Sequence, residues 1–327
     1  MEKPRLGDAV VRVVTAGEAL IDLIAEGERF KPCLGGAVYN FTRALARQGI
    51  DCAYLNPLSQ DRFGRQLAAQ LIEDGAVLAA PTPVAQPTSL AVVALNEAGK
   101  ADYAFYREGV ADRVVTASTL QAAQARYADV EVVCTGCLAL APDDANTYLP
   151  WLRAARAAGQ RVVVDANLRL AVIADIAPYR DNVFAALGLA DVIKVSDDDL
   201  LALGLNHSDP IAAATTLFAR TEAVVVAVTL GARGAAMLLR GGTVFRAAET
   251  RALRVVDTVG AGDCFLAGLI AAWLQGPASI DAALWREHGA AWLAHAVASA
   301  SLCVQAAGCV PPDWEQASAQ ARAWQTA

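Results

Sequence analysis

A glycine-rich turn that runs straight into an apolar helix pattern is the feature that most constrains this chain. The turn is the stretch 257–263, D-T-V-G-A-G-D, and the segment Cys264–Leu274 that follows is apolar with helical spacing. Residues with little or no side chain let their backbone N–H groups approach a ligand closely. A helix N-terminus adds free donors and the positive end of a dipole, so the stretch predicts an anion site suited to phosphate.

Asp263 closes this turn, and two roles are open to it. A carboxylate repels a bound phosphate, so one placed beside a phosphate site suggests that it takes a proton from a nucleophile. The alternative is an ordinary glycine loop in which Asp263 is the N-cap of the helix.

Composition bounds the class of protein. The chain has 327 residues, of which 55% are hydrophobic and 19% charged, with a net charge of −7. This is enough apolar sequence for a large core, and without a basic field no nucleic-acid partner is expected. The stretch 1–8 has no apolar leader core, and seven scattered Cys fit reduced, buried thiols, so a cytoplasmic protein is expected. The lone C-x-x-C pair, Cys134 and Cys137, has no second pair beside it for a metal or redox site.

One segment is long enough to cross a bilayer. Residues 289–308 include no Lys, Arg, Asp or Glu, but they are rich in Ala, Ser and Gly. We interpret them as a buried helix of a large α/β core, with no membrane association.

Strand-like and helix-like segments alternate along the chain, which is typical of a parallel sheet covered by helices. Polar residues repeatedly follow a strand, at the sheet edge where ligands of open α/β sheets bind. The predicted strands are Val10–Ala16, Cys52–Leu55, Val130–Val133, Arg161–Asp165, Asp191–Val195, Ala223–Thr229 and Ala235–Leu239. The predicted helices lead from Asn40 to Gly49 and span Arg65–Asp74, Asp143–Ala158, Pro178–Leu189 and Ile211–Arg220.

The alternation breaks between Thr88 and Arg107. Ser89–Leu95 and Tyr103–Tyr106 are strand-like and adjacent, with 97–100 as a hairpin turn between them. Together with the segment Leu20–Phe30 they predict a small β lid, formed by about 18–34 and 87–108, on a single domain spanning 1–327. A mobile lid suits phosphoryl transfer because it excludes water from the donor.

The long D-T-V-G-A-G-D-x-F-x-A-G stretch resembles the C-terminal signature of the ribokinase-like (PfkB-type) carbohydrate kinases. The resemblance implies a three-layer α/β/α fold with a mainly parallel sheet and a small β-sheet lid. It implies that Gly260, Ala261 and Gly262 form an anion hole and that Asp263 is the general base. In that family Asp257 belongs to a monovalent-cation loop, so Asp257 would help to hold potassium; a simple turn-starting Asp is the alternative.

Two further motifs belong to the phosphate end. Asp165-Ala-Asn167-Leu-Arg169 resembles the family's D-x-N-x-R, which would place Asn167 and Arg169 beside the transferring phosphoryl group or the substrate. Lys194-Val-Ser196-Asp-Asp-Asp199 stands where many relatives have N-x-x-E, a motif tied to magnesium and its waters. Here Asp199 replaces the longer Glu, Asp198 is a rival metal residue, and the three carboxylates could instead cap the following helix.

Other matches point to the nucleotide and the sugar. Thr229-Leu-Gly231-Ala-Arg-Gly234 resembles the nucleotide segment T-x-G-x-x-G, and with Lys194 and Gly262 it would bind ATP. Asp22 follows the first strand, and the pair Gly35 and Gly36 with Asn40 resembles G-G-x-x-x-N. A carboxylate and an amide can hydrogen-bond vicinal hydroxyls, and glycine lets a sugar reach the backbone.

Arg107 ends the lid segment Tyr103–Arg107, which resembles a substrate-covering segment of fructokinases and 2-keto-3-deoxygluconate kinases. It could grip a hydroxyl or a carboxylate, or it could be a solvated Arg at the end of a strand.

The prediction is therefore an ATP- and Mg²⁺-dependent sugar kinase, closest in appearance to the fructokinases. Fructose is the first choice of substrate, and 2-keto-3-deoxygluconate, ribose and a nucleoside are alternatives. A non-catalytic sugar- or nucleotide-binding relative and an NAD oxidoreductase remain as other classes, although the chain has no G-x-G-x-x-G after its first strand. An exposed lid edge could also pair with a second copy to give a homodimer.

Overall fold

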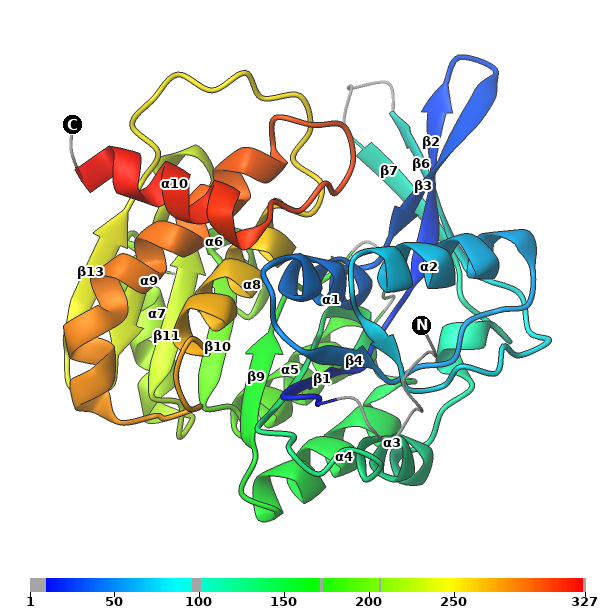
Figure 1. Ribbon diagram of the computed structural model, residues 1–327, viewed down its shortest axis with the longest axis horizontal. Helices are drawn as coiled ribbons and strands as arrows, with labels where there is room; N and C mark the ends of the chain where they lie inside the picture. The colour runs from blue at the N-terminus through cyan, green and yellow to red at the C-terminus, as the bar shows by residue number, and fades with distance from the viewer. Residues whose placement is uncertain (1–9, 96–100, 171–172, 174, 206, 326–327) are drawn as a thin grey trace.

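A nine-stranded sheet forms the centre of the computed structural model, which describes residues 10–95, 101–170, 173, 175–205 and 207–325 (Figure 1). Seven neighbouring strands run parallel, and β12 and β13 join one edge antiparallel to it. In spatial order the strands are β13 (Val244–Ala247), β12 (Ala235–Leu239), β11 (Val225–Thr229), β10 (Val192–Ser196), β9 (Arg161–Asp165), β8 (Val132–Gly136), β1 (Val13–Thr15), β4 (Cys52–Tyr54) and β5 (Val77–Leu78). The predicted mainly parallel sheet is confirmed.

Two apolar cores cover the two faces of this sheet. Alternate residues of one strand enter opposite cores: Val162 and Val164 of β9 lie in one, and Val163 in the other. The first core is covered by α3 (Ala117–Gln124), α4 (Ala145–Ala157), α5 (Ile176–Leu187), α6 (Asp197–Ala202) and α7 (Pro210–Thr215). The second is covered by α1 (Ala37–Arg47), α2 (Arg62–Glu73), α8 (Ala261–Trp273), α9 (Ala282–Cys303) and α10 (Trp314–Gln325). The three-layer α/β/α fold is thus as predicted.

A separate four-stranded sheet stands to one side of the main sheet (Figure 1). Its order is β3 (Arg29–Gly35), β2 (Leu20–Glu26), β6 (Ser89–Leu95) and β7 (Ala101–Tyr106). β2 pairs antiparallel with β3 and parallel with β6, which joins chain segments 69 residues apart in one sheet, as in the pair Leu20 and Ser89. The predicted hairpin turn at 97–100 lies outside the described residues, whereas the antiparallel pairing of β6 with β7 is as predicted.

The helix that carries the glycine-rich turn is buried from its third residue to its end. From Asp263 to Trp273 every residue of α8 is buried, because the helix lies between the sheet and α9. The predicted buried helix at 289–308 is confirmed up to Cys303, where α9 ends, and residues 304–308 form the turn that follows. Among the described residues, no helix combines the length and the hydropathy that crossing a bilayer would need.

Gly268 lies at a close approach of α8 to α9. A Cβ added at Gly268 would lie 2.5 Å from Ser299 Oγ and 3.1 Å from the Cα of Ala296, both on α9. Because backbone cannot yield as a flexible side chain can, this glycine sets the distance between the two helices.

We expect Gly268→Val to lower the free energy of unfolding by about 1–3 kcal/mol, the usual cost of overpacking a close-packed core. Urea denaturation followed by circular dichroism would measure it. The matched control is Gly276→Val, since no atom lies within 4 Å of a Cβ added there. Equal stability of the two variants would contradict this account of the α8–α9 contact.

Candidate active site

The glycine-rich turn ends in the first turn of α8, as the sequence predicted. Gly260 is the N-cap, in the left-handed conformation with φ of 78°, and a Cβ there would lie 2.6 Å from Cβ of Cys309. Asp263 is the third residue of the helix, so the alternative in which it serves as N-cap is wrong. Its side chain is therefore available for another role.

Asp263 is a buried carboxylate with one side-chain hydrogen bond. Asn40, from the first turns of α1, donates from Nδ2 to Oδ2 of Asp263 at 3.0 Å. Burial raises the pKa of Asp263 to about 6, against the opposing effects of Lys194, the Asn40 hydrogen bond and Arg169. This combination gives a carboxylate that is ionised at neutral pH and takes a proton readily.

Lys194 brings a buried cation to the same place. Its Nζ donates to Oδ2 of Asp165 at 3.1 Å and lies 3.0 Å from Oδ1. A Cβ added at Gly262 would lie 3.0 Å from this Nζ, so the ammonium group sits directly against the turn. Burial raises the pKa of Asp165 to about 7 even beside this cation, with Asp199 and Asp263 adding to the rise. Lys194 therefore offsets the charge of several clustered carboxylates.

Arg169 and Asn167 come from the loop after β9. Asn167 is buried with a positive φ of 38°, a conformation that Asn tolerates better than most residues. Burial lowers the pKa of Arg169, but the nearby acidic groups of Cys137, Asp263 and Asp199 raise it overall. Arg169 therefore brings a positive charge close to Asp263, where an anionic ligand could bind.

The carboxylates after β10 have a clear structural role. Ser196 and Asp199 form a capping box: Asp199 N donates to Ser196 Oγ, and Ser196 N donates to Asp199 Oδ2 at 2.7 Å. Oδ1 of Asp199 accepts from Leu168 N at 2.8 Å, which ties α6 to the loop that carries Arg169. The contacts of Asp199 are therefore those of the helix-capping alternative. Asp198, by contrast, is exposed.

The lid contributes Asp22 to the same region. Burial raises the pKa of Asp22 to about 6, with Arg169 lowering it and Asp257 raising it further. A Cβ at Gly35, on the neighbouring strand β3, would overlap the Asp22 carboxylate. Gly36 has φ of 107°, and a Cβ there would lie 2.6 Å from the carbonyl oxygen of Glu18. Both glycines are therefore required by close approaches at the base of the lid.

Arg107 is drawn into the protein rather than towards solvent. Its Nη2 donates to Oδ2 of Asp144 at 3.0 Å, and Arg113 binds the other oxygen of Asp144. The charges of Asp112 and Glu18 also stabilise its cationic form. Arg107 is therefore not the solvated Arg at the end of a strand that the sequence left open, because its side chain is largely buried in this ion pair.

The T-x-G-x-x-G segment lies next to α6, at the end of β11. Thr229 pairs with Ser196 across the sheet, and Gly231 and Gly234 have positive φ of 57° and 84°. Arg233, between the glycines, makes an exposed 2.7 Å ion pair with Asp197. The segment thus continues the line of loops along the carboxyl edge of the sheet.

Asp257 joins two loops at the start of the glycine-rich stretch. Oδ1 accepts from Val259 N at 3.0 Å and Oδ2 accepts from Gly308 N at 2.8 Å. These bonds hold the turn before α8 against the loop after α9.

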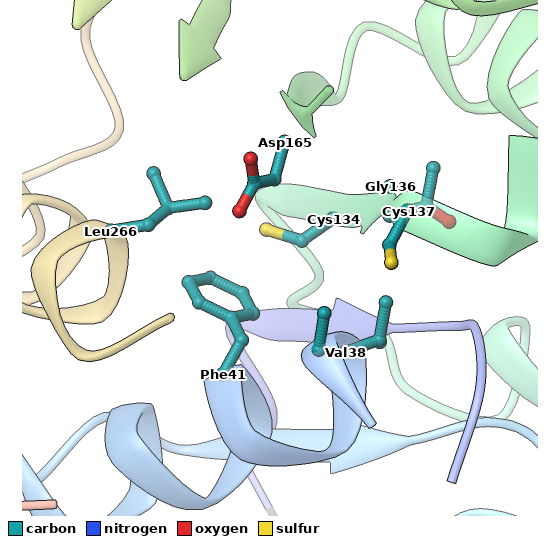
Figure 2. A pocket seen from close by; sticks show the side chains of 9 residues that line it. Val38, Phe41, Cys134, Gly136, Cys137, Asp165 and Leu266 are labelled. Carbon is teal, nitrogen blue, oxygen red and sulfur yellow. The ribbon is translucent and has the colours of Figure 1, made fainter. Parts of the chain in front are cut away.

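A small cavity lies beneath the site, between α1, the end of β8 and α8. Its volume is about 10 Å³, enough for one water and far below the size of a sugar. Figure 2 shows the Asp165 carboxylate at its edge, with the Cys134 thiol and the Phe41 ring beside it. The cavity is therefore part of the floor of the site and does not itself hold a substrate.

Sequence reasoning missed two acidic residues of this region. Glu18 is buried, and burial raises its pKa; its Oε1 accepts from Ala37 N at 3.0 Å, at the start of α1. Asp144 anchors the two lid-side arginines, Arg107 and Arg113. Glu18 stands four residues before Asp22 in the stretch 17–22, G-E-A-L-I-D, but the sequence carried no signal for Asp144.

Comparison with known proteins identifies the family of this chain. The family model "pfkB family carbohydrate kinase" matches residues 10–316. This chain belongs to that family. It is an ATP-dependent carbohydrate kinase. A fructokinase of Rhizobium leguminosarum bv. trifolii is 33% identical over 264 residues, covering 79% of this chain and 78% of that protein.

Two solved structures are similar to this kinase over almost its whole length. Fructokinase with bound ATP from Xylella fastidiosa has a TM-score of 0.83 and 27% identity, covering 96% of this chain and 99% of that chain. Fructokinase from Vibrio cholerae O395 with fructose, ADP and calcium ion bound has a TM-score of 0.76 and 26% identity, covering 95% and 99%. The fold predicted from the sequence is thus also found in sugar kinases of solved structure.

The raised pKa of Asp263 predicts a stability effect with a defined sign. Its folded-state pKa of about 6 lies above the ordinary value of 3.8, so its contribution to stability is present below about pH 4 and is lost as pH rises through 6. Asp263→Asn removes the buried charge and keeps an acceptor for Asn40. We expect it to raise the free energy of unfolding by about 1–3 kcal/mol at pH 8.

Urea denaturation at pH 8 and pH 4 would test this, with the gap between variant and wild type shrinking at the lower pH. A wild type that is the more stable protein at pH 8 would show that Lys194 and Arg169 overcompensate the burial of Asp263.

Proposed function

We propose that this kinase transfers the γ-phosphate of ATP to a primary hydroxyl of fructose, with Asp263 as the general base. The observation that carries the proposal is the buried Asp263 carboxylate, held by Asn40 at the N-terminus of α8. One position thus combines a proton acceptor with backbone donors for a phosphate. The fructokinases among the relatives support fructose as the acceptor.

In the proposed reaction the sugar hydroxyl oxygen attacks the γ-phosphorus, and the bond from that phosphorus to the bridging oxygen of ADP breaks. Asp263 accepts the hydroxyl proton, which its pKa of about 6 permits at neutral pH. Asn40 fixes the orientation of the carboxylate. The backbone N–H groups of Gly260, Ala261 and Gly262 would lie near the charge that develops on the transferring group, with Ala261 N also donating to the carbonyl oxygen of Thr258 at 3.3 Å.

The nucleotide would lie along the loops at the carboxyl edge of the sheet. Thr229, Gly231 and Gly234 would contact ATP through their backbone, because the two glycines adopt conformations that bring main chain close to a ligand. Lys194 lies against Gly262, so its charge would act on the phosphates as well as on Asp165.

A divalent cation, Mg²⁺ in our proposal, neutralises phosphate charge when bound. Both oxygens of Asp199 already accept backbone hydrogen bonds, so this residue fits such an ion only through the ion's waters. Exposed Asp198 is the rival. Asp257 would position the loop for potassium, since its own oxygens bind Val259 and Gly308.

The sugar would lie between the lid and Asp263. Asp22, Gly35, Gly36 and Asn167 would contact its hydroxyls, and Arg169 would contact the phosphoryl group being transferred. Arg107 is paired with Asp144, which leaves it poorly placed for an acidic substrate and favours a neutral sugar over 2-keto-3-deoxygluconate. Arg107 would then act at the base of the lid.

The lid sheet has two edge strands, β3 and β7. We propose that a homodimer, if one forms, uses such an edge, because unpaired strand edges favour association with a second copy.

Asp263→Asn should lower kcat by about 10²-fold or more, the scale of a lost general base, while KM for fructose changes little. Steady-state ADP release would measure both. Asp198→Asn is the matched control, with the same chemical change on an exposed residue; a similar loss there would move the metal role to Asp198. Full activity of Asp263→Asn would show that another group takes the proton.

The substrate itself is tested by ADP release with ATP and Mg²⁺ on fructose, 2-keto-3-deoxygluconate, ribose, glucose and adenosine. We expect fructose to give the highest kcat/KM. A higher value for 2-keto-3-deoxygluconate would contradict the inference from the Arg107–Asp144 pair. No ADP release with any of the five, while ATP still raises the melting temperature of the protein, would support a non-catalytic binding protein instead.

A further inference from the structure

Three cysteines meet behind the glycine-rich turn. Cys264 lies in the first turns of α8, Cys303 is the last residue of α9, and Cys309 lies in the loop that follows. All three are buried, and their Sγ atoms lie within 4.8 Å of one another. Spacings of 39 and 6 residues match no metal motif in the sequence, so only the fold brings them together.

We propose that Cys264, Cys303 and Cys309 bind a thiophilic divalent cation of the zinc class, and that the bound ion slows phosphoryl transfer by displacing the turn at 259–263. The first part concerns the cysteines alone. The second part rests on the proposed kinase function of Asp263.

The geometry is close to that of a thiolate site. Tetrahedral zinc with Zn–S bonds of about 2.3 Å separates its sulfur ligands by about 3.8 Å. Sulfur atoms within 4.8 Å of one another therefore need to move by no more than about 1 Å to bind one ion. Three protein ligands leave a fourth position for water.

The surroundings bring positive charge to the cluster. Arg43 donates from Nη1 to the carbonyl oxygen of Cys309 at 3.1 Å, and its Nε pairs with Asp74 at 2.6 Å. The N-terminal end of α8 adds a positive dipole beside Cys264. Both groups would partly offset the negative charge that three thiolates and one divalent ion would leave.

Each cysteine also contacts the turn that carries the anion site. Cys264 N donates to the carbonyl oxygen of Gly260 at 2.8 Å. Cys303 Sγ donates to the carbonyl oxygen of Val259 at 3.6 Å, and Cβ of Cys309 packs against Gly260. Drawing the three sulfur atoms together would therefore displace the donors of Gly260–Gly262 relative to Asp263. A positioned group moved by about 1 Å can cost up to about 10²-fold in rate.

Binding is tested with Cd²⁺ added to reduced, metal-free full-length protein, followed by thiolate-to-metal charge-transfer absorption. We expect saturation at one Cd²⁺ per chain, with the band lost in Cys303→Ser and in Cys309→Ser. Cys52→Ser is the matched control, because Cys52 is a buried thiol of β4 outside the cluster. Circular dichroism melting of every variant separates a lost site from a lost fold.

No charge-transfer band in the wild type would overturn the site, and so would a wild-type band in both cluster variants. These outcomes need no kinase activity, so a failure of the proposed function is distinguishable from a failure of the site.

The effect on the turn is tested by ADP release at saturating Mg-ATP and fructose with increasing Cd²⁺. Wild type should lose about tenfold or more in kcat, and Cys303→Ser should lose less than about twofold. Equal inhibition of both proteins would show that Cd²⁺ acts elsewhere, and bound Cd²⁺ without inhibition would overturn the coupling to the turn.

Discussion

The burial of clustered carboxylates around one lysine is the constraint on which this site depends. Asp165 and Asp263 both lie in the protein interior, where burial raises the pKa of each. Lys194 is the buried cation that opposes this rise, and it reaches Asp165 directly. The sheet edge, α1 and α8 must all be in place for this balance, because an unpaired buried charge is costly. The catalytic chemistry is thus inseparable from the packing of the layers.

That packing also explains why glycine recurs at the site. Gly262 leaves space for Lys194 Nζ, Gly35 leaves space for Asp22, and Gly268 sets the distance between α8 and α9. At each position a side chain would clash with the neighbouring group, so the contact forms only because the residue is glycine. These three glycines are therefore required by neighbouring groups, whereas at Gly36 and Gly260 a left-handed backbone conformation adds to a close approach.

The lid depends on a pairing that spans distant sequence. β2 pairs with β3 on one side and with β6 on the other, so Asp22 lies on an inner strand of the small sheet. Its pKa responds to the charges of Arg169 and Asp257. Arg107, just after β7, pairs with Asp144 at the start of α4, which joins the small sheet to a helix of the first core. A substrate bound against Asp22 would thus contact the small sheet and the loops of the large one. Closure over a phosphoryl donor needs such contacts on both sides.

The sequence by itself determined the layers, the mainly parallel sheet, the small β-sheet and the turn before α8. These follow from local patterns: β-branched runs, helical spacing and glycine signals act over a few residues. The kinase family followed from the signature around Asp263 and the matches at Asn40 and Arg169. Only the tertiary structure decided that both carboxylate oxygens of Asp199 accept backbone hydrogen bonds and that Arg107 pairs with Asp144. It also decided that three cysteines distant in sequence meet behind Gly260. Such contacts join residues tens to hundreds of positions apart, and no local pattern encodes which partner a buried polar group will find.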